Sequence, residues 1–324
     1  MASLSGKNVM VTGAAGFIGS HLCDILLTDS CNRLVAIDNL FLGKEKNLES
    51  AKGSENFIFI NGDITNYELL KSIVIDYHID VIFHLAVVPL EVSLENPIWC
   101  FEENIKMTEN ILEIVRQSEY KITLIAYSSS EVYGSALYVP MDEDHPLLAH
   151  TPYAASKAAS DMLIYSYIKT FNIDAAIVRP FNNFGPRQNE GSWAGIIPVT
   201  IKRILKGEKP IIYSDGKQTR DFIYVEATAY WTLEIFKNEN TRGEIINLSS
   251  GKQTEVGDII KLICDEMNYT GIIERRPARI GDVLKHQGSM KKAEKLINFN
   301  YGTIFKDAIK NTIDWYRINI DLNL

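Results

Sequence analysis

The chain is organised around a glycine-rich segment near its N-terminus. The short apolar run Val9–Val11 predicts a buried parallel strand, and apolar residues at helical spacing between Phe17 and Leu26 predict a helix directly after it. Three glycines, Gly13, Gly16 and Gly19, fall at the turn between the two elements. Glycine lets a backbone turn tightly and approach a phosphate, while a helix N-terminus offers free N–H groups and a positive dipole end. The segment therefore predicts a pyrophosphate-binding turn.

The residue that ends the next predicted strand identifies the cofactor. A glycine triplet alone also fits an ordinary turn, but Leu34–Ile37 predicts a second strand that ends at Asp38. A carboxylate at that place can accept hydrogen bonds from both hydroxyls of an adenosine ribose and would repel a 2′-phosphate. We therefore predict a dinucleotide cofactor, and NAD rather than NADP.

Strands and helices continue to alternate through the first 180 or so residues. This alternation predicts an α/β fold with a doubly wound parallel sheet, of the Rossmann type. Asp63 and Ile64 follow the third strand, and His84, Leu85 and Ala86 follow the fourth, at the sheet edge where such folds bind ligands. The further strands are predicted at Asn56–Ile60, Asp80–Phe83, Ile122–Ala126 and Ala175–Val178.

The C-terminal third predicts a smaller substrate domain that is interleaved with the first. Glu226–Phe236 has the pattern of a helix and Glu244–Leu248 that of a strand returning to the large sheet. We expect residues 1–179, together with 222–248, to form the NAD-binding domain. Residues 180–221 and 249–324 are then expected to form the domain that binds the substrate.

Composition excludes several other classes of protein. The net charge of -8 and the absence of a basic run argue against a nucleic-acid partner. No apolar stretch reaches the length of a membrane span, and the first residues lack the pattern of a signal peptide, so we expect a cytoplasmic protein with no membrane partner. The four cysteines are scattered and no histidine cluster lies near them, so we expect neither a metal site nor a disulfide framework.

A tyrosine and a lysine four residues apart are the candidate catalytic pair. Tyr153 and Lys157 share a helix face, where an ammonium can stabilise a phenolate and lower its pKa. The spacing alone carries no weight, because Tyr67/Lys71, Tyr165/Lys169 and Tyr213/Lys217 repeat it. Tyr153 differs because it begins a helix that follows a serine-rich strand end. There the Ser129 hydroxyl could hydrogen-bond the substrate oxygen from which Tyr153 takes a proton.

Taken together, these motifs resemble the extended short-chain dehydrogenase/reductase family, specifically its nucleotide-sugar epimerases, dehydratases and decarboxylases. The likeness runs from about residue 7 to 316 and rests on motifs that occur in the family's order along the chain. They are Gly13-x-x-Gly16-x-x-Gly19, Asp38, Asp63, His84-Leu-Ala86, Ser129, Tyr153-x-x-x-Lys157 and Arg179-Pro-Phe-Asn182.

The resemblance implies that NAD stays bound, oxidises a sugar at C4 and later returns the hydride. In that case Tyr153 is the base, Lys157 holds the nicotinamide ribose and Ser129 orients the C4 hydroxyl, with Asn104 behind the tyrosine. Further cofactor contacts are expected from Phe17, Ile18, Asn39, Ile64, Leu85, Ala86, Asn104 and Pro180. A nucleoside-diphosphate sugar, most readily a UDP-sugar, is expected to meet Glu91, Ser129, Asn182, Arg187, Arg220, Arg279 and Asp282.

The segments that distinguish the reactions within the family give conflicting indications. Ser130-Glu131 resembles the pair found in 4,6-dehydratases and in UDP-uronate decarboxylases, and a glutamate there could remove the C5 proton. Pro89-Leu-Glu91 resembles a turn of decarboxylases, whereas Tyr138–Pro146 resembles dehydratases of acetamido-sugar pathways. We rank lyase chemistry slightly above 4-epimerisation, and a catalytically silent NAD-binding regulator below both.

The same family resemblance predicts how the protein assembles. Asn96–Gln117 and Pro152–Phe171 are expected to be helices with ample apolar surface. Related enzymes pair these two helices across a two-fold axis, so a homodimer is expected.

Overall fold

A parallel sheet forms the centre of the molecule. The computed structural model describes residues 1–189, 195–277, 285–297 and 302–319. Seven strands pair in the order β11-β6-β5-β4-β1-β2-β3, every pair parallel, which confirms the predicted doubly wound fold. The order changes direction between β1 and β4, the point at which such sheets bind ligands. The strands are β1 (Asn8–Thr12), β2 (Arg33–Asp38), β3 (Phe57–Asn61), β4 (Val81–His84), β5 (Thr123–Tyr127), β6 (Asp174–Pro180) and β11 (Ile245–Leu248).

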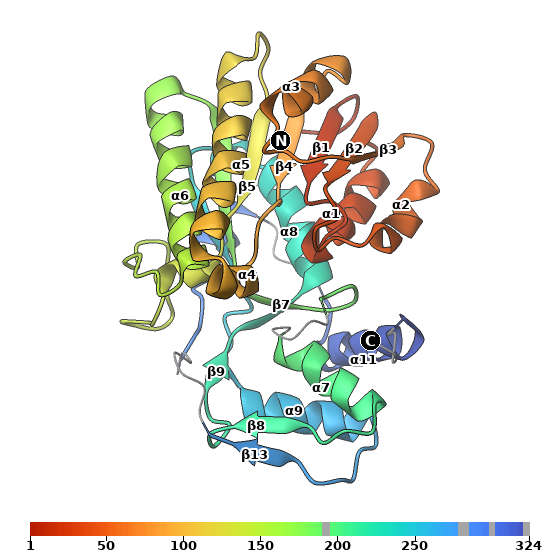
Figure 1. Ribbon diagram of the computed structural model, residues 1–324. Coiled ribbons are helices and arrows are strands. Elements are labelled where there is room, and N and C mark those ends of the chain that lie inside the picture. Colours follow the sequence, from red (N-terminus) through yellow and green to blue (C-terminus); the bar gives the residue numbers. More distant parts are fainter. Residues whose placement is uncertain (190–194, 278–284, 298–301, 320–324) are drawn as a thin grey trace.

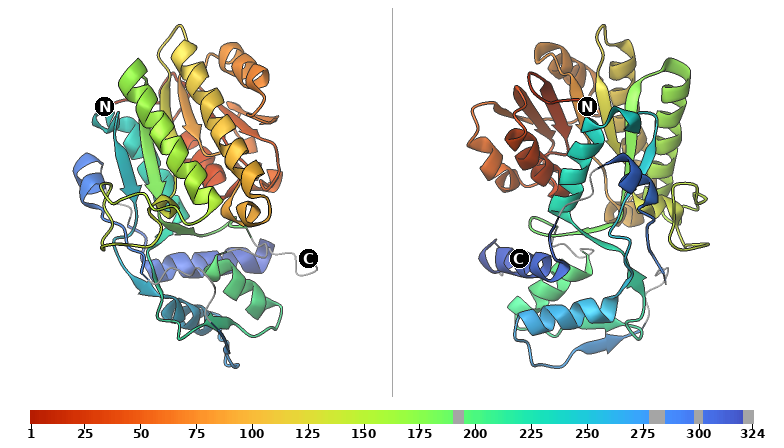
Figure 2. Two further views of the ribbon diagram at one scale, coloured as in Figure 1. Left: turned by 60° about the vertical axis from the view of Figure 1, so that its left-hand side comes forward. Right: turned by 180° about the vertical axis from the view of Figure 1, so that it is seen from behind.

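Helices cover both faces of the sheet (Figures 1 and 2). Alternate residues of β1 belong to two cores: Val9 and Val11 pack beneath α1 and α8, whereas Met10 packs on the other side beneath α3, α5 and α6. A strand buried on both faces needs an unbroken apolar run, which is what β1 supplies. The bounds are α1 (Phe17–Thr28), α3 (Tyr67–Asp76), α5 (Pro97–Gln117), α6 (Pro152–Phe171) and α8 (Val225–Lys237).

Local signals fix the helix α6 at both ends. The Thr151 hydroxyl accepts a hydrogen bond from the Ala154 amide at 3.1 Å, and Pro152 occupies the first turn. Asn172 takes the left-handed conformation that ends the helix. The structure confirms the predicted bounds of this helix, and Tyr153 consequently lies in its first turn.

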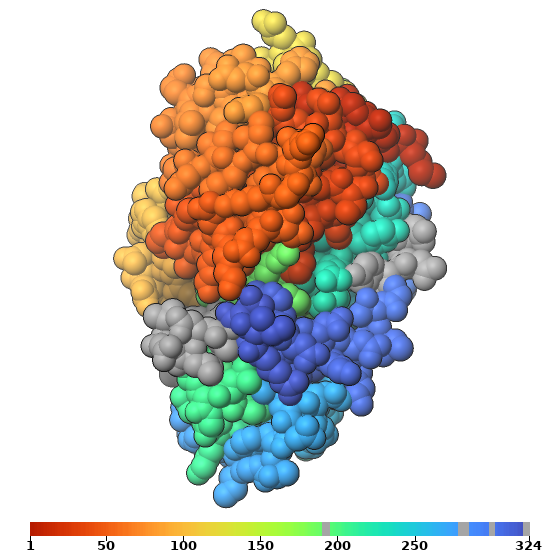
Figure 3. Space-filling model, turned by 90° about the vertical axis from the view of Figure 1, so that its right-hand side faces the viewer, coloured from red at the N-terminus to blue at the C-terminus, as the bar shows by residue number. Residues whose placement is uncertain are grey.

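The C-terminal part packs below the carboxyl edge of the sheet, as the ribbon and space-filling views show (Figures 1 and 3). It has a separate apolar core around Ile201, Ile263 and Ile309. Short strands join it to the sheet region: β7 (Asn182–Phe184) pairs with β10 (Phe222–Tyr224), and β9 (Thr219–Arg220) with β12 (Thr254–Glu255). The other elements are α7 (Ile196–Leu205), β8 (Ile211–Tyr213), α9 (Val256–Glu266), β13 (Glu274–Arg276) and α11 (Phe305–Asn319).

The chain passes between the two parts more than once. After β10 it returns through α8, which packs on α1, and through β11, which forms the edge of the large sheet. The helix α10 (Lys291–Leu296) also contacts β11, although the sequence assigned it to the smaller domain. Within the described ranges, no helix has both the length and the apolar character that a membrane crossing requires. The remaining short helices are η1 (Glu45–Leu48), α2 (Glu49–Lys52), α4 (Leu90–Glu95), η2 (Ser130–Tyr133) and η3 (Glu239–Thr241).

Candidate active site

The glycine turn between β1 and α1 requires its glycines for steric reasons. Gly13 has a φ of +66°, and a Cβ there would lie 2.7 Å from the Ala86 amide nitrogen. A Cβ on Gly19 would lie 2.2 Å from the Gly13 carbonyl oxygen. Gly16 precedes the first turn of α1 and supplies no side chain to cap it. The first amides of α1 are therefore available to an anion, as the sequence predicts.

A cavity of about 470 Å³ begins at this turn and follows the carboxyl edge of the sheet. Its lining holds the predicted cofactor residues with one exception, Asn104. In those parts of the chain that the structure describes, no group of three or more His, Cys, Asp or Glu side chains could hold a metal ion. The predicted residues in the lining are Gly13, Gly16, Phe17, Ile18, Gly19, Asp38, Asn39, Asp63, Ile64, Leu85, Ala86, Tyr153, Lys157 and Pro180.

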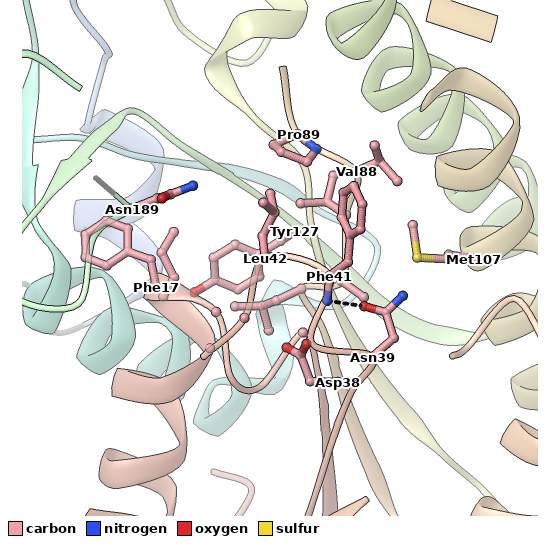
Figure 4. A pocket seen from close by; sticks show the side chains of 18 of the residues that line it. Phe17, Asp38, Asn39, Phe41, Leu42, Val88, Pro89, Met107, Tyr127 and Asn189 are labelled. Carbon is pink, nitrogen blue, oxygen red and sulfur yellow. Dashed lines mark hydrogen bonds between the residues drawn. The ribbon is translucent and has the colours of Figure 1, made fainter. Parts of the chain in front are cut away.

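Asp38 reaches the cavity from the end of β2 (Figure 4), and its carboxylate also braces the glycine turn. It accepts hydrogen bonds from the amides of Ala15 at 2.9 Å and Leu40 at 2.8 Å. Burial raises the pKa of this carboxyl group, and the backbone donors oppose that shift. Asp63, from the end of β3, is held by Thr65 and by the Asn39 side-chain amide at 3.0 Å. Two fixed carboxylates therefore lie in one cavity wall.

An aromatic pair that the sequence did not single out lies in the same wall. Phe41, after β2, and Trp99, in α5, meet edge to face with their ring centroids 5.5 Å apart. Met107 lines the cavity nearby (Figure 4). A flat apolar ligand surface such as a nucleobase suits these side chains. No local pattern indicates a contact between residues so far apart in the chain.

Asn104 corrects one expected cofactor contact. Its amide oxygen accepts from the Val88 amide at 2.7 Å, and its amide nitrogen donates to the Val88 carbonyl at 3.0 Å and to Ser156 at 2.9 Å. The side chain is buried and does not line the cavity. Its polar atoms are already bonded within the protein, so it positions the loop after β4 against α6 instead of facing the cofactor.

Ser129 and Tyr153 are brought together by the fold. Ser129 follows β5 and caps η2, its hydroxyl accepting from the Glu131 amide at 3.2 Å, and it also shares a hydrogen bond with the Tyr153 hydroxyl. A second cavity, of about 530 Å³, opens beside them toward the C-terminal part. Tyr153 and Ser129 line both cavities. Tyr153 and Ser129 thus lie where the two cavities meet.

Lys157 is buried one turn after Tyr153 in α6. Its ammonium donates to the Tyr127 carbonyl, and burial lowers the pKa of Lys157 to about 8, against the charge of Asp161. Burial raises the pKa of Tyr153, as do the carboxylates of Glu131 and Glu91. The Lys157 ammonium is thus bonded to a backbone oxygen in this arrangement, and its effect on the tyrosine pKa stays a prediction.

The structure also distinguishes Tyr153/Lys157 from two other tyrosine–lysine pairs that have the same spacing. The ammonium of Lys71 lies over the Tyr67 ring, 5.9 Å from its centroid, and that of Lys169 lies 5.1 Å from the Tyr165 centroid. None of these four residues lines either cavity. Stacking of this kind is a surface cation–π contact with no proton-transfer geometry.

A buried polar network supports the end of β5, next to Ser129. Asp161, one turn after Lys157 in α6, accepts from the Ser128 hydroxyl at 2.8 Å and from the Arg179 guanidinium at 2.9 Å. Arg179 donates in turn to the Tyr133 hydroxyl, which donates to the Asn247 side chain. The network joins β5, α6, β6 and β11, and fixes the residue beside Ser129.

The second cavity contains Glu91 and Arg220, which were predicted to bind the substrate, and Glu131, which was predicted to be catalytic. Glu131, with Ser130, lines it from η2, Glu91 from α4 and Arg220 from β9. Burial raises the pKa of both glutamates, and the charge of Arg220 partly opposes the shift at Glu131. Asn182 also lines this cavity.

Three other predicted substrate positions have different outcomes. Arg187 lines the first cavity and not the second, and its guanidinium pairs with Asp24 of α1 at 2.7 Å. Arg187 thus lies beside the first cavity, and its contact with the substrate stays a prediction. Arg279 and Asp282 lie outside the described residues.

Two buried residues that the sequence did not indicate hydrogen-bond to segments that line the second cavity. His286 meets the Asn182 side chain at 3.1 Å and bonds to the Ser130 backbone, and burial lowers its pKa to about 4. Asp221 accepts from Ser250 and from the amides of Gly251 and Gly288. Asp221 follows Arg220 directly, so these bonds anchor the strand that carries the arginine.

Comparison with known proteins matches nearly the whole chain to one family. The family model described as GDP-mannose 4,6 dehydratase matches residues 10–312. A UDP-N-acetyl-alpha-D-glucosaminuronate decarboxylase of Bacillus cytotoxicus is 30% identical, over 96% of this chain and 98% of its own. The structure of a UDP-N-acetylglucosamine 4-epimerase from Methanobrevibacter ruminantium, in complex with UDP-N-acetylmuramic acid, is 31% identical, with a TM-score of 0.89 over 98% and 100% of the two chains. DesIV, a dTDP-glucose 4,6-dehydratase from Streptomyces venezuelae solved with NAD, is 26% identical, with a TM-score of 0.89 over 96% and 97%.

Proposed function

Because the chain belongs to the GDP-mannose 4,6-dehydratase family, a group of NAD-dependent extended short-chain dehydrogenases/reductases that act on nucleotide sugars, we propose that it oxidises a nucleotide sugar transiently at C4. In this proposal Tyr153 removes the proton of the C4 hydroxyl, and Ser129 holds the oxygen. The protein is an NAD-dependent enzyme of this family. What is proposed is the reaction and the roles of its residues.

The observation that carries the proposal is the position of Tyr153 between two cavities. One cavity contains the glycine turn and Asp38, and the other contains Arg220 and Asn182. A base that lines both can act on a sugar whose C4 hydrogen faces the cofactor. Ser129, bonded to the same hydroxyl, can orient the sugar oxygen.

The first cavity suits NAD on structural grounds. The glycine turn and the uncapped start of α1 are suited to the pyrophosphate, and Asp38 to the adenosine ribose. Bound NAD supplies a hydride acceptor that later gives the hydride back. Lys157 is proposed to hold the nicotinamide ribose, and Asp63 the adenine edge.

We expect Asp38→Ala to weaken NAD binding and to relax the preference for NAD over NADP. The carboxylate accepts from Ala15 as well as facing the cavity, so its removal affects both the ribose contact and the turn. Asp38→Asn keeps one acceptor oxygen and should lose less affinity. Titration of apoprotein with NAD and NADP measures both effects, and equal affinity of the unchanged protein for the two cofactors would contradict the assignment.

The substrate is proposed to be a nucleoside-diphosphate sugar, most readily a UDP-sugar. Arg220 and Asn182, in the second cavity, are suited to the diphosphate, because guanidinium and amide groups donate to phosphate oxygens. We assign this cavity mainly to the domain formed by residues 180–221 and 249–324. Two of the relatives described above carry UDP-sugars in their names, which supports the choice of base.

Glu131 favours lyase chemistry over epimerisation. A ketone at C4 makes the C5 hydrogen acidic, and a buried glutamate with a raised pKa in the same cavity is a suitable acceptor. In a 4,6-dehydratase the C5–H and C6–O bonds break, water leaves and the hydride returns to C6. In a uronate decarboxylase the C5 carboxylate leaves as carbon dioxide. A 4-epimerase remains the alternative, because re-reduction of the rotated ketone needs only Ser129 and Tyr153.

A panel of UDP-, GDP- and dTDP-sugars incubated with the holoenzyme tests the proposal. Products followed by mass and NMR distinguish loss of one water, loss of one carbon dioxide and no change in mass. Consumption of none of these sugars, with NAD fully bound, would favour a binding protein that has kept the fold without the reaction.

We further propose that the enzyme is a homodimer formed through α5 and α6. The two helices lie side by side on one face of the sheet (Figure 2) and expose Ile98 and Phe101 on one, and Met162 and Tyr165 on the other. Exposed apolar groups gathered in this way favour a partner surface. We expect a dimeric mass at micromolar concentration and a monomeric mass for Met162→Asp. A monomer for the unchanged protein would argue against this surface.

A further inference from the structure

The helix α5 presents one of its faces to the first cavity. Trp99, Glu103 and Met107 line that cavity, and because they are spaced four residues apart they share one side of the helix. Asn104, the next residue after Glu103, is directed to α6 instead, where it bonds to Ser156. The cavity is thus bordered by the residue next to the one that the sequence indicates.

This face of α5 borders the adenosine end of the cavity. Asp38 is suited to the adenosine ribose, and Asp63 lies at the end of the neighbouring strand in the same cavity wall. The Asn39 side-chain amide bonds to Asp63 at 3.0 Å and so joins the two strand ends. Burial raises the pKa of Glu103, and the charges of Asp63 and Glu102 raise it further. The carboxyl group of Glu103 therefore lies near that of Asp63.

Three apolar side chains border the same end of the cavity. Phe41 and Trp99 meet edge to face, and they are 51% and 41% exposed although they line the cavity, so they lie at its rim. Met107 extends from α5 toward Phe41 (Figure 4). Exposed aromatic rings at a cavity rim gain contact area when a flat ring packs against them.

The two carboxyl groups leave acceptor sites for a ligand. Asp63 accepts three hydrogen bonds from Thr65 and Asn39, and a carboxylate offers about four acceptor sites, so one remains. Among the residues that the structure describes, none donates a hydrogen bond to the Glu103 carboxylate. A ligand group that faces both carboxylates must therefore donate, and the exocyclic amino group of adenine has two N–H bonds to give.

We infer that Trp99 and Glu103 recognise the adenine base of NAD, Trp99 by contact with the ring and Glu103, together with Asp63, by accepting from the amino group. The inference rests on the assignment of the first cavity to NAD and does not depend on the proposed oxidation at C4. It implies selection against a base with a carbonyl oxygen in place of the amino group, because that oxygen would face two acceptors.

Nicotinamide hypoxanthine dinucleotide tests this selection, because a carbonyl oxygen takes the place of the adenine amino group. It and NAD are each used to displace NADH from the enzyme, followed by the fluorescence of bound NADH, at about pH 8, well above the usual pKa of both carboxyl groups. We expect the hypoxanthine dinucleotide to bind about 10- to 10²-fold more weakly, the usual loss for a hydrogen bond to a charged group. Equal affinity for the two dinucleotides would overturn the proposal.

Glu103→Gln assigns the effect to one residue. Glutamine keeps an acceptor oxygen for adenine and adds an N–H donor for the hypoxanthine oxygen, so the preference for NAD should shrink by about tenfold. Glu102→Gln is the matched control, because Glu102 is the neighbour of Glu103 on α5, carries the same charge, is exposed and does not line the cavity. It should leave the ratio of the two affinities unchanged. A ratio that is equally unchanged in Glu103→Gln would refute the role of Glu103.

Trp99→Ala distinguishes contact with the ring from recognition of the amino group. This variant should weaken both dinucleotides alike, by about tenfold, because an aromatic side chain packs on either base. Trp99→Phe keeps an aromatic ring and should recover most of the affinity. Undiminished binding of both dinucleotides by Trp99→Ala would contradict the ring contact.

The outcomes distinguish this inference from the function proposed above. The affinities are measured without a sugar, so they stay measurable if no nucleotide sugar reacts. Equal binding of the two dinucleotides would refute the recognition of the base and leave the proposed oxidation at C4 in place. Failure of the unchanged protein to bind NAD would overturn both.

Discussion

Replacing Tyr153 with phenylalanine should abolish every fate of the sugar, including the transient reduction of NAD. The C4 hydroxyl proton then has no acceptor at the point where the two cavities meet. A positioned acid–base group is usually worth about 10²- to 10⁴-fold in rate, so a loss in that range is expected. The variant keeps the ring that packs at the start of α6, so NAD content and thermal stability should stay close to those of the parent.

Glu131→Gln should separate the second step from the first. C4 oxidation still proceeds through Tyr153, so enzyme-bound NADH accumulates and is visible in the near-ultraviolet, while product formation collapses. In deuterated water, either lyase should place deuterium at C5 of the product, where a dehydratase re-protonates the carbon and a decarboxylase replaces the lost carboxylate with hydrogen. The mass of the product, lower by one water or by one carbon dioxide, then separates the two reactions. Full turnover by Glu131→Gln with no solvent deuterium in the product would discard lyase chemistry in favour of epimerisation.

Asp161→Ala should be the most destabilising single substitution near the site. Asp161 and Arg179 each expose only 2% of their side chains, so removing the carboxylate leaves a guanidinium buried without its counter-charge. Breaking one partner of a buried pair costs about 3–5 kcal/mol of unfolding free energy. Chemical denaturation measures this loss of unfolding free energy. The slope of that free energy against denaturant concentration should stay unchanged.

An exposed ion pair provides the control for this substitution. Arg116 and Glu113 are 2.6 Å apart on α5 and are partly exposed, and Glu113 also accepts from the Tyr167 hydroxyl of α6. Glutamine keeps an acceptor oxygen for that bond, so Glu113→Gln should change stability far less than Asp161→Ala. Replacing both buried charges, as in Asp161→Leu combined with Arg179→Met, should recover part of the loss. A single-variant loss no greater than that of Glu113→Gln would contradict the role given to the network.

The strands and long helices of the large domain were predictable because their signals are local. A buried strand needs an apolar run. The ends of a helix such as α6 are indicated by its capping residues, Thr151 and Pro152 at the start and Asn172 at the end. The glycine turn and Asp38 were predictable for the same reason, since a fixed spacing places them at a strand end. The short strands β7, β9, β10 and β12 were not predicted, because each is only two or three residues long.

The parts of the site that depend on tertiary contacts escaped prediction. Three contacts join segments that are distant in the chain: Phe41 packs against Trp99, His286 bonds to Asn182, and Asn104 bonds to Ser156. The Lys157 ammonium was expected to act on Tyr153, but a spacing of four residues does not say which acceptor it will find. Residue type and spacing place a group on a face, and only the packed structure identifies its partner.

The return of the chain to the large sheet has a consequence for synthesis on the ribosome. The edge strand β11 lies beyond residues 182–220, most of which belong to the smaller part, so the sheet cannot be completed until residue 248 has emerged. Until then one edge of β6 is unpaired. Residues 182–220 also lack their packing partners α9 and α11, which are synthesised later. The nascent chain therefore passes through a stage in which β6 is an open sheet edge. The glycine turn is already complete at that stage, so binding of NAD there would be the first ligand contact able to stabilise the partly made sheet.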